Sequence, residues 1–168
     1  MNKTIPATIS PAETLDRPGG RIAYSLSGDG PLAVCIPGMG DLRQVYRFLA
    51  PALNEAGVRV AAMDLRGHGD SEATFDSYND VAAGSDAVEL VKKLGGPALL
   101  VGNSMGAGAA VWAAAEAPEL VAGLVLLGPF VRNPPVNPLA AAMFRLALLR
   151  PWGPAAWYAY YASLYPGR

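Results

Sequence analysis

The stretch "LLVGNSMGAG", residues 99–108, places a serine between Gly102 and Gly106 in the pattern G-x-S-x-G. An apolar run precedes Ser104 and an alanine-rich run follows it, so we predict a buried strand, a sharp turn at the serine and then a helix. Such a turn needs small residues two positions before and after the serine. The first N–H groups of the helix would favour negative charge on the serine oxygen. The alternative is a glycine-flanked serine in an ordinary turn.

Strands and helices are predicted to alternate along the chain on both sides of this turn. Apolar or alternating runs predict strands over 21–27, 32–36, 58–63, 98–102 and 121–128. Helical patterns cover 42–57, 78–94 and 106–117. This alternation with short connections predicts an α/β fold, with a mostly parallel, doubly wound sheet and helices on both faces.

Two of these helices carry more detailed predictions. Asp41 and Gln44 have the spacing of a capping box, and Pro51 predicts a kink or a restart within the first helix. The second helix is predicted to be amphipathic, with one apolar side formed by Val81, Val88, Val91 and Leu94.

Composition limits the class of protein. The chain has 168 residues, 52% of them hydrophobic and 16% charged, which is enough for one globular domain with a proper core. A net charge of −1 without a basic block argues against nucleic acid or an anionic surface as a partner. Cys35 is the only cysteine, so we expect a small core residue without a redox role. With no signal-peptide pattern and no membrane span in the sequence, we expect a soluble cytoplasmic protein.

Three segments, in order along the chain, resemble the α/β-hydrolases that use a serine nucleophile. They are "VCIPGMGD" (34–41), "MDLRGHGDS" (63–71) and "VGNSMGA" (101–107), and the resemblance covers roughly residues 20–130. It implies that Ser104 is the nucleophile and that the backbone N–H groups of Met39 and Met105 form the oxyanion hole. The glycines of this loop and turn are Gly38, Gly102 and Gly106. We expect no cofactor and no metal ion.

The first segment departs from the family pattern, which usually has His-Gly where this chain has Pro37-Gly38. That histidine is mainly structural in the family, so we expect the loop to keep its shape. The side chain of Met39 would then line the substrate pocket or, alternatively, fill the core.

The residues that would activate Ser104 are missing from this sequence. The resemblance implies an acid and then a histidine after the serine, but only Glu116 and Glu119 follow it and no histidine does. His68 is the single histidine, and the family's strand order starts its loop about 10 Å from the serine turn. We therefore predict that His68 is a loop residue. Asp64, Arg66 and Asp70 are likewise predicted to organise that loop.

We therefore expect the front part of a longer enzyme, in which the C-terminal strands and part of the lid are missing. Residues 1–128 would be the N-terminal part of the α/β-hydrolase core, and 129–168 the start of a helical lid over an apolar pocket. The alternatives for this tail are an ordinary packed helical region or a surface left exposed by a lost partner. The missing C-terminal strands and helices would then carry the acid and the base, and this chain would pair with that C-terminal segment or with a partner chain. Without it, the strand predicted at 121–128 is an exposed, uncharged sheet edge.

The predicted reaction is hydrolysis of an ester or related acyl bond in a small apolar acyl substrate, through a covalent acyl-enzyme, with little turnover by this chain alone. A serine rather than an aspartate at position 104 argues against the haloalkane and epoxide branches of the family. One alternative is a non-catalytic domain that binds a ligand or a partner. Another is a dinucleotide-binding domain in which Asp64 grips a ribose, although Arg43 stands where the third glycine should be.

Overall fold

Residues 12–129 and 137–163 are described by the computed structural model of the chain. The chain divides into two units, Met1–Val131 and Arg132–Arg168. Residues 130–136, near the start of the predicted lid, lie outside the described residues.

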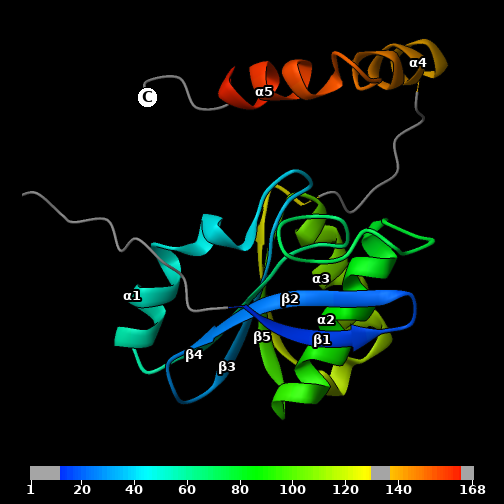
Figure 1. Cartoon of the computed structure of the whole chain (residues 1–168). Helices are drawn as coiled ribbons and strands as arrows, with labels where there is room; N and C mark the ends of the chain where they lie inside the picture. The colour runs from blue at the N-terminus through cyan, green and yellow to red at the C-terminus, as the bar shows by residue number, and fades with distance from the viewer. Residues whose placement is uncertain (1–11, 130–136, 164–168) are drawn as a thin grey trace, which may run out of the picture. The chain divides into compact units, whose positions relative to one another are not determined.

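One twisted sheet organises the larger unit (Figure 1). Its described strands are β1 (Glu13–Arg17), β2 (Gly20–Ser27), β3 (Leu32–Ile36), β4 (Arg59–Met63), β5 (Ala98–Asn103) and β6 (Val121–Leu127). Their spatial order is β1-β2-β4-β3-β5-β6. The pairs β4–β3, β3–β5 and β5–β6 are parallel, whereas β2 is antiparallel to both β1 and β4. β3 therefore lies between β4 and β5.

Helices cover both faces of this sheet, as the alternating pattern predicts. The described helical segments of the larger unit are η1 (Arg43–Tyr46), α1 (Leu49–Glu55), α2 (Asp80–Leu94), α3 (Met105–Glu116) and η2 (Pro118–Leu120). Figure 1 shows α1 on one side of the sheet and α2 with α3 on the other. Successive strand residues alternate accordingly: Cys35 packs with Tyr46 on the α1 side, while Val34 and Ile36 join the larger core under α2 and α3.

The helix predicted over 42–57 is two shorter elements, η1 and α1. The predicted capping box is wrong, because Leu42 is the N-cap of η1 and no side chain caps it. The Asp41 carboxylate instead accepts a hydrogen bond from Asn103 Nδ2 at 3.3 Å. Pro51 lies in the first turn of α1, where its missing N–H would have no helical acceptor. The predicted restart near Pro51 therefore occurs.

The prediction for α2 holds except at its first turn. Asn79 caps the helix by accepting a hydrogen bond from the N–H of Ala82 at 2.9 Å, and Gly95, with φ 83°, ends it. Val88 and Val91 are buried as predicted, but Val81 is 43% exposed, so its predicted burial is wrong.

The smaller unit contains α4 (Pro138–Ala147) and α5 (Gly153–Ser163). Most large apolar side chains of α4 are exposed, among them Leu139, Met143 and Phe144. The role of this unit as a lid stays a prediction. Among the described helices, none has the length and apolar character needed to cross a bilayer.

Within the described residues, β6 forms one edge of the sheet and pairs only with β5. Leu124, Val125 and Leu127 are exposed on it, and its sequence carries no charge. The predicted exposed apolar edge is confirmed.

A buried carboxylate on α2 ties the end of β1 to the loop after β4. Asp86 on α2 is fully buried and accepts hydrogen bonds from Arg17 Nε at 2.8 Å and from Arg66 Nε and Nη2 at 2.7 and 2.8 Å. Arg17 also bonds Ser85 Oγ at 2.7 Å, and the Arg66 guanidinium lies 4.4 Å from the centre of the Phe75 ring. Two largely buried cations therefore share one fully buried carboxylate, and Arg17 also lies 3.9 Å from Glu89 Oε2.

Replacing Asp86 with alanine should reduce the free energy of unfolding by about 3–5 kcal/mol, because it removes the buried carboxylate that both arginines share. Urea unfolding followed by circular dichroism measures this change. Glu55→Gln is the matched control, since Glu55 is exposed on α1, away from this network, and its replacement should cost no more than about 0.5 kcal/mol. Equal losses in the two variants would contradict this account of the network.

Candidate active site

Ser104 sits at the turn between β5 and α3, and its backbone is strained. Its φ of 54° and ψ of −116° make it the one non-glycine residue with positive φ in the described part of the chain. Its N–H donates to the carbonyl of Leu127 at 2.8 Å, and its carbonyl accepts from the N–H of Ala107 at 3.0 Å. The predicted sharp turn is confirmed, and the packing around it holds the serine in this conformation.

Two glycines make this packing possible. A Cβ on Gly102 would overlap the backbone of Gly106 and Ala107, and one on Gly106 would overlap the carbonyl oxygens of Ile36 and Pro37. The first turn of α3 therefore rests directly on the end of β3. The predicted need for small residues on both sides of Ser104 is confirmed.

The loop that follows β3, residues 37–41, lies beside Ser104. A Cβ added to Gly38 would stand 3.2 Å from the Cβ of Ser104. The N–H of Asp41 donates to the carbonyl of Gly38 at 3.1 Å, so the loop keeps a tight turn with Pro37 in place of the family's histidine.

Met105 is the first residue of α3, so its N–H has no acceptor within the helix. Among the hydrogen bonds found between described residues, none is donated by the N–H of Met39 or of Met105. Two backbone donors from separate segments are therefore available near the serine.

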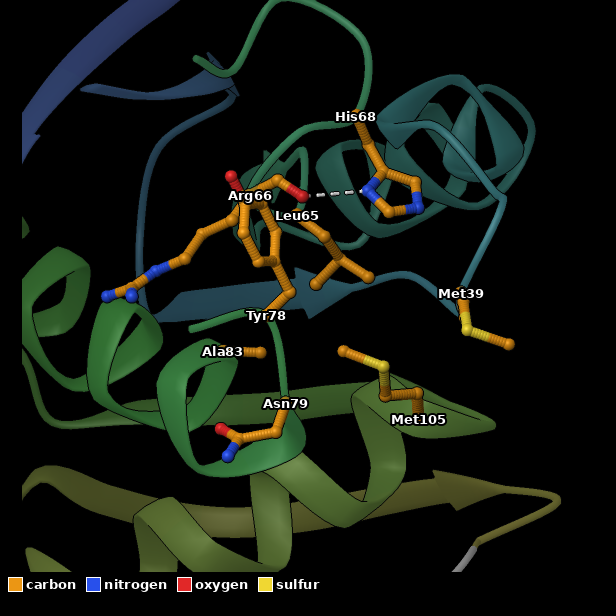
Figure 2. Close-up of a pocket in the computed structure, with 8 residues that line it drawn as sticks. All are labelled: Met39, Leu65, Arg66, His68, Tyr78, Asn79, Ala83 and Met105. Carbon is orange, nitrogen blue, oxygen red and sulfur yellow. Dashed lines mark hydrogen bonds between the residues drawn. The ribbon is translucent and has the colours of Figure 1, made fainter. Parts of the chain in front are cut away.

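Ser104 borders a cavity of about 420 Å³. It is lined by Met39, Tyr78, Asn79, Asp80, Ser104, Met105 and Gly108. A smaller cavity of about 110 Å³ shares Met39, Tyr78, Asn79 and Met105 and adds Leu65, Arg66, His68 and Ala83 (Figure 2). Met39 is 52% exposed and lines both cavities, so of the two alternatives for its side chain the structure supports pocket lining.

His68 does not bond to Ser104. Its Nε2 lies 3.0 Å from the N–H nitrogen of Gly40, and its Nδ1 lies 2.9 Å from the carbonyl oxygen of Arg66. The described residues offer no hydrogen bond to the Ser104 hydroxyl. The prediction that His68 belongs to the loop structure rather than acting as the base is supported by these contacts.

The dinucleotide alternative is wrong, because Asp64 is already occupied. Asp64 is fully buried, accepts a hydrogen bond from the N–H of Arg43 at 2.7 Å and forms an ion pair with the Arg43 guanidinium. Arg43 also bonds Asp70 at 2.7 Å and Ser25 Oγ at 2.9 Å. The residue that replaces the third glycine thus takes the carboxylate that a ribose would need.

The loop-organising roles predicted for Asp64, Arg66 and Asp70 are confirmed by these networks. Figure 2 shows the Arg66 guanidinium pointing away from Met39 and Met105. Its Nε donates a hydrogen bond to Asp86 at 2.7 Å.

Neither carboxylate that follows Ser104 in the sequence is near it. Glu116 ends α3 and Glu119 lies in η2, and both are exposed. A helix of 12 residues is about 18 Å long, so these groups lie at the far end of α3 from the serine.

Comparison with known proteins identifies the family. Residues 31–163 match the family model for the alpha/beta hydrolase fold, and the chain belongs to that family. It is 34% identical over 140 residues to bifunctional epoxide hydrolase 2 of Sus scrofa, covering 80% of this chain and 25% of that protein. It is 32% identical over 127 residues to 2-(acetamidomethylene)succinate hydrolase of Mesorhizobium japonicum, covering 73% and 45%.

Comparison with solved structures supports the same family. An epoxide hydrolase from Vigna radiata matches with a TM-score of 0.69 and 31% identity, over 80% of this chain and 43% of that one. An esterase from Exiguobacterium antarcticum matches with a TM-score of 0.63 and 29% identity, over 67% and 42%. The chain thus spans less than half the length of these relatives.

The strained backbone generates a prediction. Ser104→Gly should raise the free energy of unfolding by about 1 kcal/mol relative to Ser104→Ala, because glycine adopts positive φ without a Cβ penalty. Both variants lack the hydroxyl, so the difference between their free energies of unfolding reports the strain of the backbone at position 104. Thermal and urea unfolding of the two variants measure it, and a less stable glycine variant would show that position 104 is not strained.

Proposed function

We propose that the protein is a serine hydrolase that cleaves an ester or related acyl bond, with Ser104 as its nucleophile. One observation carries the proposal. The chain holds a serine in a left-handed backbone conformation at the rim of a cavity, beside backbone N–H groups of Met39 and Met105 that have no other acceptor among the described residues. A strained serine at the start of a helix is typical of an exposed nucleophile.

The proposed reaction has two steps. The Ser104 oxygen attacks the acyl carbon while its proton passes to a base, and the N–H groups of Met39 and Met105 stabilise the oxyanion of the tetrahedral intermediate. The bond to the leaving oxygen then breaks, that oxygen takes up the proton, and the acyl group stays on Ser104. Water attacks the acyl-serine in the same way, releasing a carboxylic acid and restoring the hydroxyl.

The identity of the nucleophile favours an acyl substrate over an epoxide, although several relatives are named epoxide hydrolases. A serine that opened an epoxide would form an ether, which water does not cleave under enzymatic conditions. A serine that attacks an acyl carbon forms an ester, which water does cleave. The solved esterase among the structural neighbours is consistent with this choice.

The cavity favours a small apolar acyl group. Its walls include the thioethers of Met39 and Met105 and the backbone of Gly108, and Asp80 is the one charged residue lining it. A negative charge at this position disfavours substrates that carry a carboxylate next to the reacting bond.

The base and its acid are proposed to come from polypeptide other than these 168 residues. The one histidine of the sequence holds two backbone groups, and both carboxylates after Ser104 lie at the wrong end of α3. The same lack of a base favours a second candidate, a non-catalytic domain that binds a ligand in this cavity. Both candidates predict little turnover by the chain alone.

Chemical rescue separates the two candidates. With p-nitrophenyl acetate, the chain alone should release nitrophenol no faster than its Ser104→Ala variant. Added imidazole should supply the missing base, so that one acetyl group accumulates on Ser104, as measured by intact mass and peptide mapping.

Subtracting the rate of nitrophenol release measured with Ser104→Ala corrects for the direct reaction of imidazole with the ester. Acetylation of Ser104 that depends on imidazole supports the nucleophile. No acetylation of Ser104 at any imidazole concentration, with the fold intact, would favour the binding domain and contradict the proposed hydrolase.

A further inference from the structure

His68 connects two loops, of which only the one after β3 has a part in the proposed reaction. It lies in the loop after β4, and its ring reaches the loop after β3 through Gly40. We propose that His68 is a positioning residue, whose neutral imidazole clamps the oxyanion-binding loop 37–41 and so fixes the N–H of Met39 beside Ser104. The catalytic role of this clamp rests on the proposed function, whereas the clamp itself rests on the two hydrogen bonds of the His68 ring.

The two hydrogen bonds determine the form of the ring. A backbone N–H can only donate, so Nε2, at 3.0 Å from the Gly40 nitrogen, must be the unprotonated acceptor. A carbonyl oxygen can only accept, so Nδ1, at 2.9 Å from the Arg66 oxygen, must carry the proton. Figure 2 shows this second bond as the dashed line. Both nitrogens are in use, which fixes the tautomer and the orientation of the ring.

The imidazole is mounted on a rigid support. Arg66 is held by its two bonds to the buried Asp86 and by a bond from Nη1 to the carbonyl of Ser77 at 3.1 Å. The backbone on both sides of the ring is also bonded: the His68 N–H donates to Leu65 at 2.9 Å, and the His68 carbonyl accepts from Ser71 at 2.9 Å. The His68 ring is therefore held in place, and its Nε2 is a fixed acceptor for the Gly40 N–H.

The clamped loop needs such a restraint. It contains Gly38 and Gly40, the latter with φ 84°, and glycines leave the intervening peptides free to rotate. The bond from the Asp41 N–H to the Gly38 carbonyl closes the turn around Met39 and Gly40, and Asn103 bonds the Asp41 side chain. Neither bond is made by the peptide groups of Met39 or Gly40 themselves, so the bond from Gly40 to His68 is the described hydrogen bond that holds the middle of the turn. Small displacements of a stabilising group cost large factors in rate.

Hydrogen exchange tests the clamp directly. The variants are His68→Leu, which removes the acceptor, His68→Asn, whose oxygen reaches only to the position of Nδ1, and His68→Gln, whose oxygen reaches to that of Nε2. The Gly40 amide should exchange about tenfold faster in the Leu and Asn variants, as expected for the loss of one hydrogen bond, and at nearly the wild-type rate in the Gln variant. Amides in the β3–β4 ladder should be unchanged in all three. Unchanged Gly40 exchange in a folded Leu or Asn variant would overturn the proposal.

A second measurement asks whether the clamp serves the site. In imidazole, the rate of Ser104 acetylation by p-nitrophenyl acetate should fall about 10- to 100-fold in the Leu and Asn variants and recover in the Gln variant, with little change in its dependence on ester concentration. Equal rates in wild type and all variants would overturn the positioning role while leaving the nucleophile intact. If even the wild type is not acetylated, the proposed function fails, and Gly40 exchange still decides whether the clamp exists.

Discussion

Close packing of the first turn of α3 against the end of β3 constrains everything around the serine. Gly106 brings that turn onto the carbonyl oxygens of Ile36 and Pro37, and Gly102 lets β5 pass beneath it. β5 ends at Asn103 and α3 begins at Met105, so one residue joins them, and Ser104 takes a positive φ of 54°. The position of the hydroxyl, of the Met105 amide and of the neighbouring loop all follow from this reversal.

Buried ion pairs stabilise the loops that surround the turn. Arg43 binds Asp64 and Asp70 and so joins the loop after β3 to the loop after β4. Asp86 on α2 binds Arg66 and so joins the second loop to a helix. Such pairs contribute little net stability, but they fix geometry, because moving either partner leaves a buried charge alone. The carboxyl edge of a parallel sheet, where ligands usually bind, is thereby held in one arrangement.

Local patterns predicted most of this fold and the sharp turn at the centre of the candidate site. The apolar run 32–36 and the glycines around Ser104 act on neighbouring residues, so the strand and the sharp turn could be inferred from sequence. β1 was missed because it is an edge strand that buries only Leu15. The capping box failed because Asp41 bonds to Asn103, far away in sequence. The contact of His68 with Gly40 joins two loops 28 residues apart, and no local pattern signals it.

The central claim is that the reversal at Ser104 places its oxygen within reach of amide hydrogens from two separate segments. A crystal structure of the chain after covalent reaction of Ser104 with a fluorophosphonate, in the presence of imidazole, tests this most directly. The account predicts the phosphoryl oxygen at about 2.7–3.1 Å from the backbone nitrogens of both Met39 and Met105. A phosphoryl oxygen that points into solvent, bonded to neither nitrogen, would contradict it.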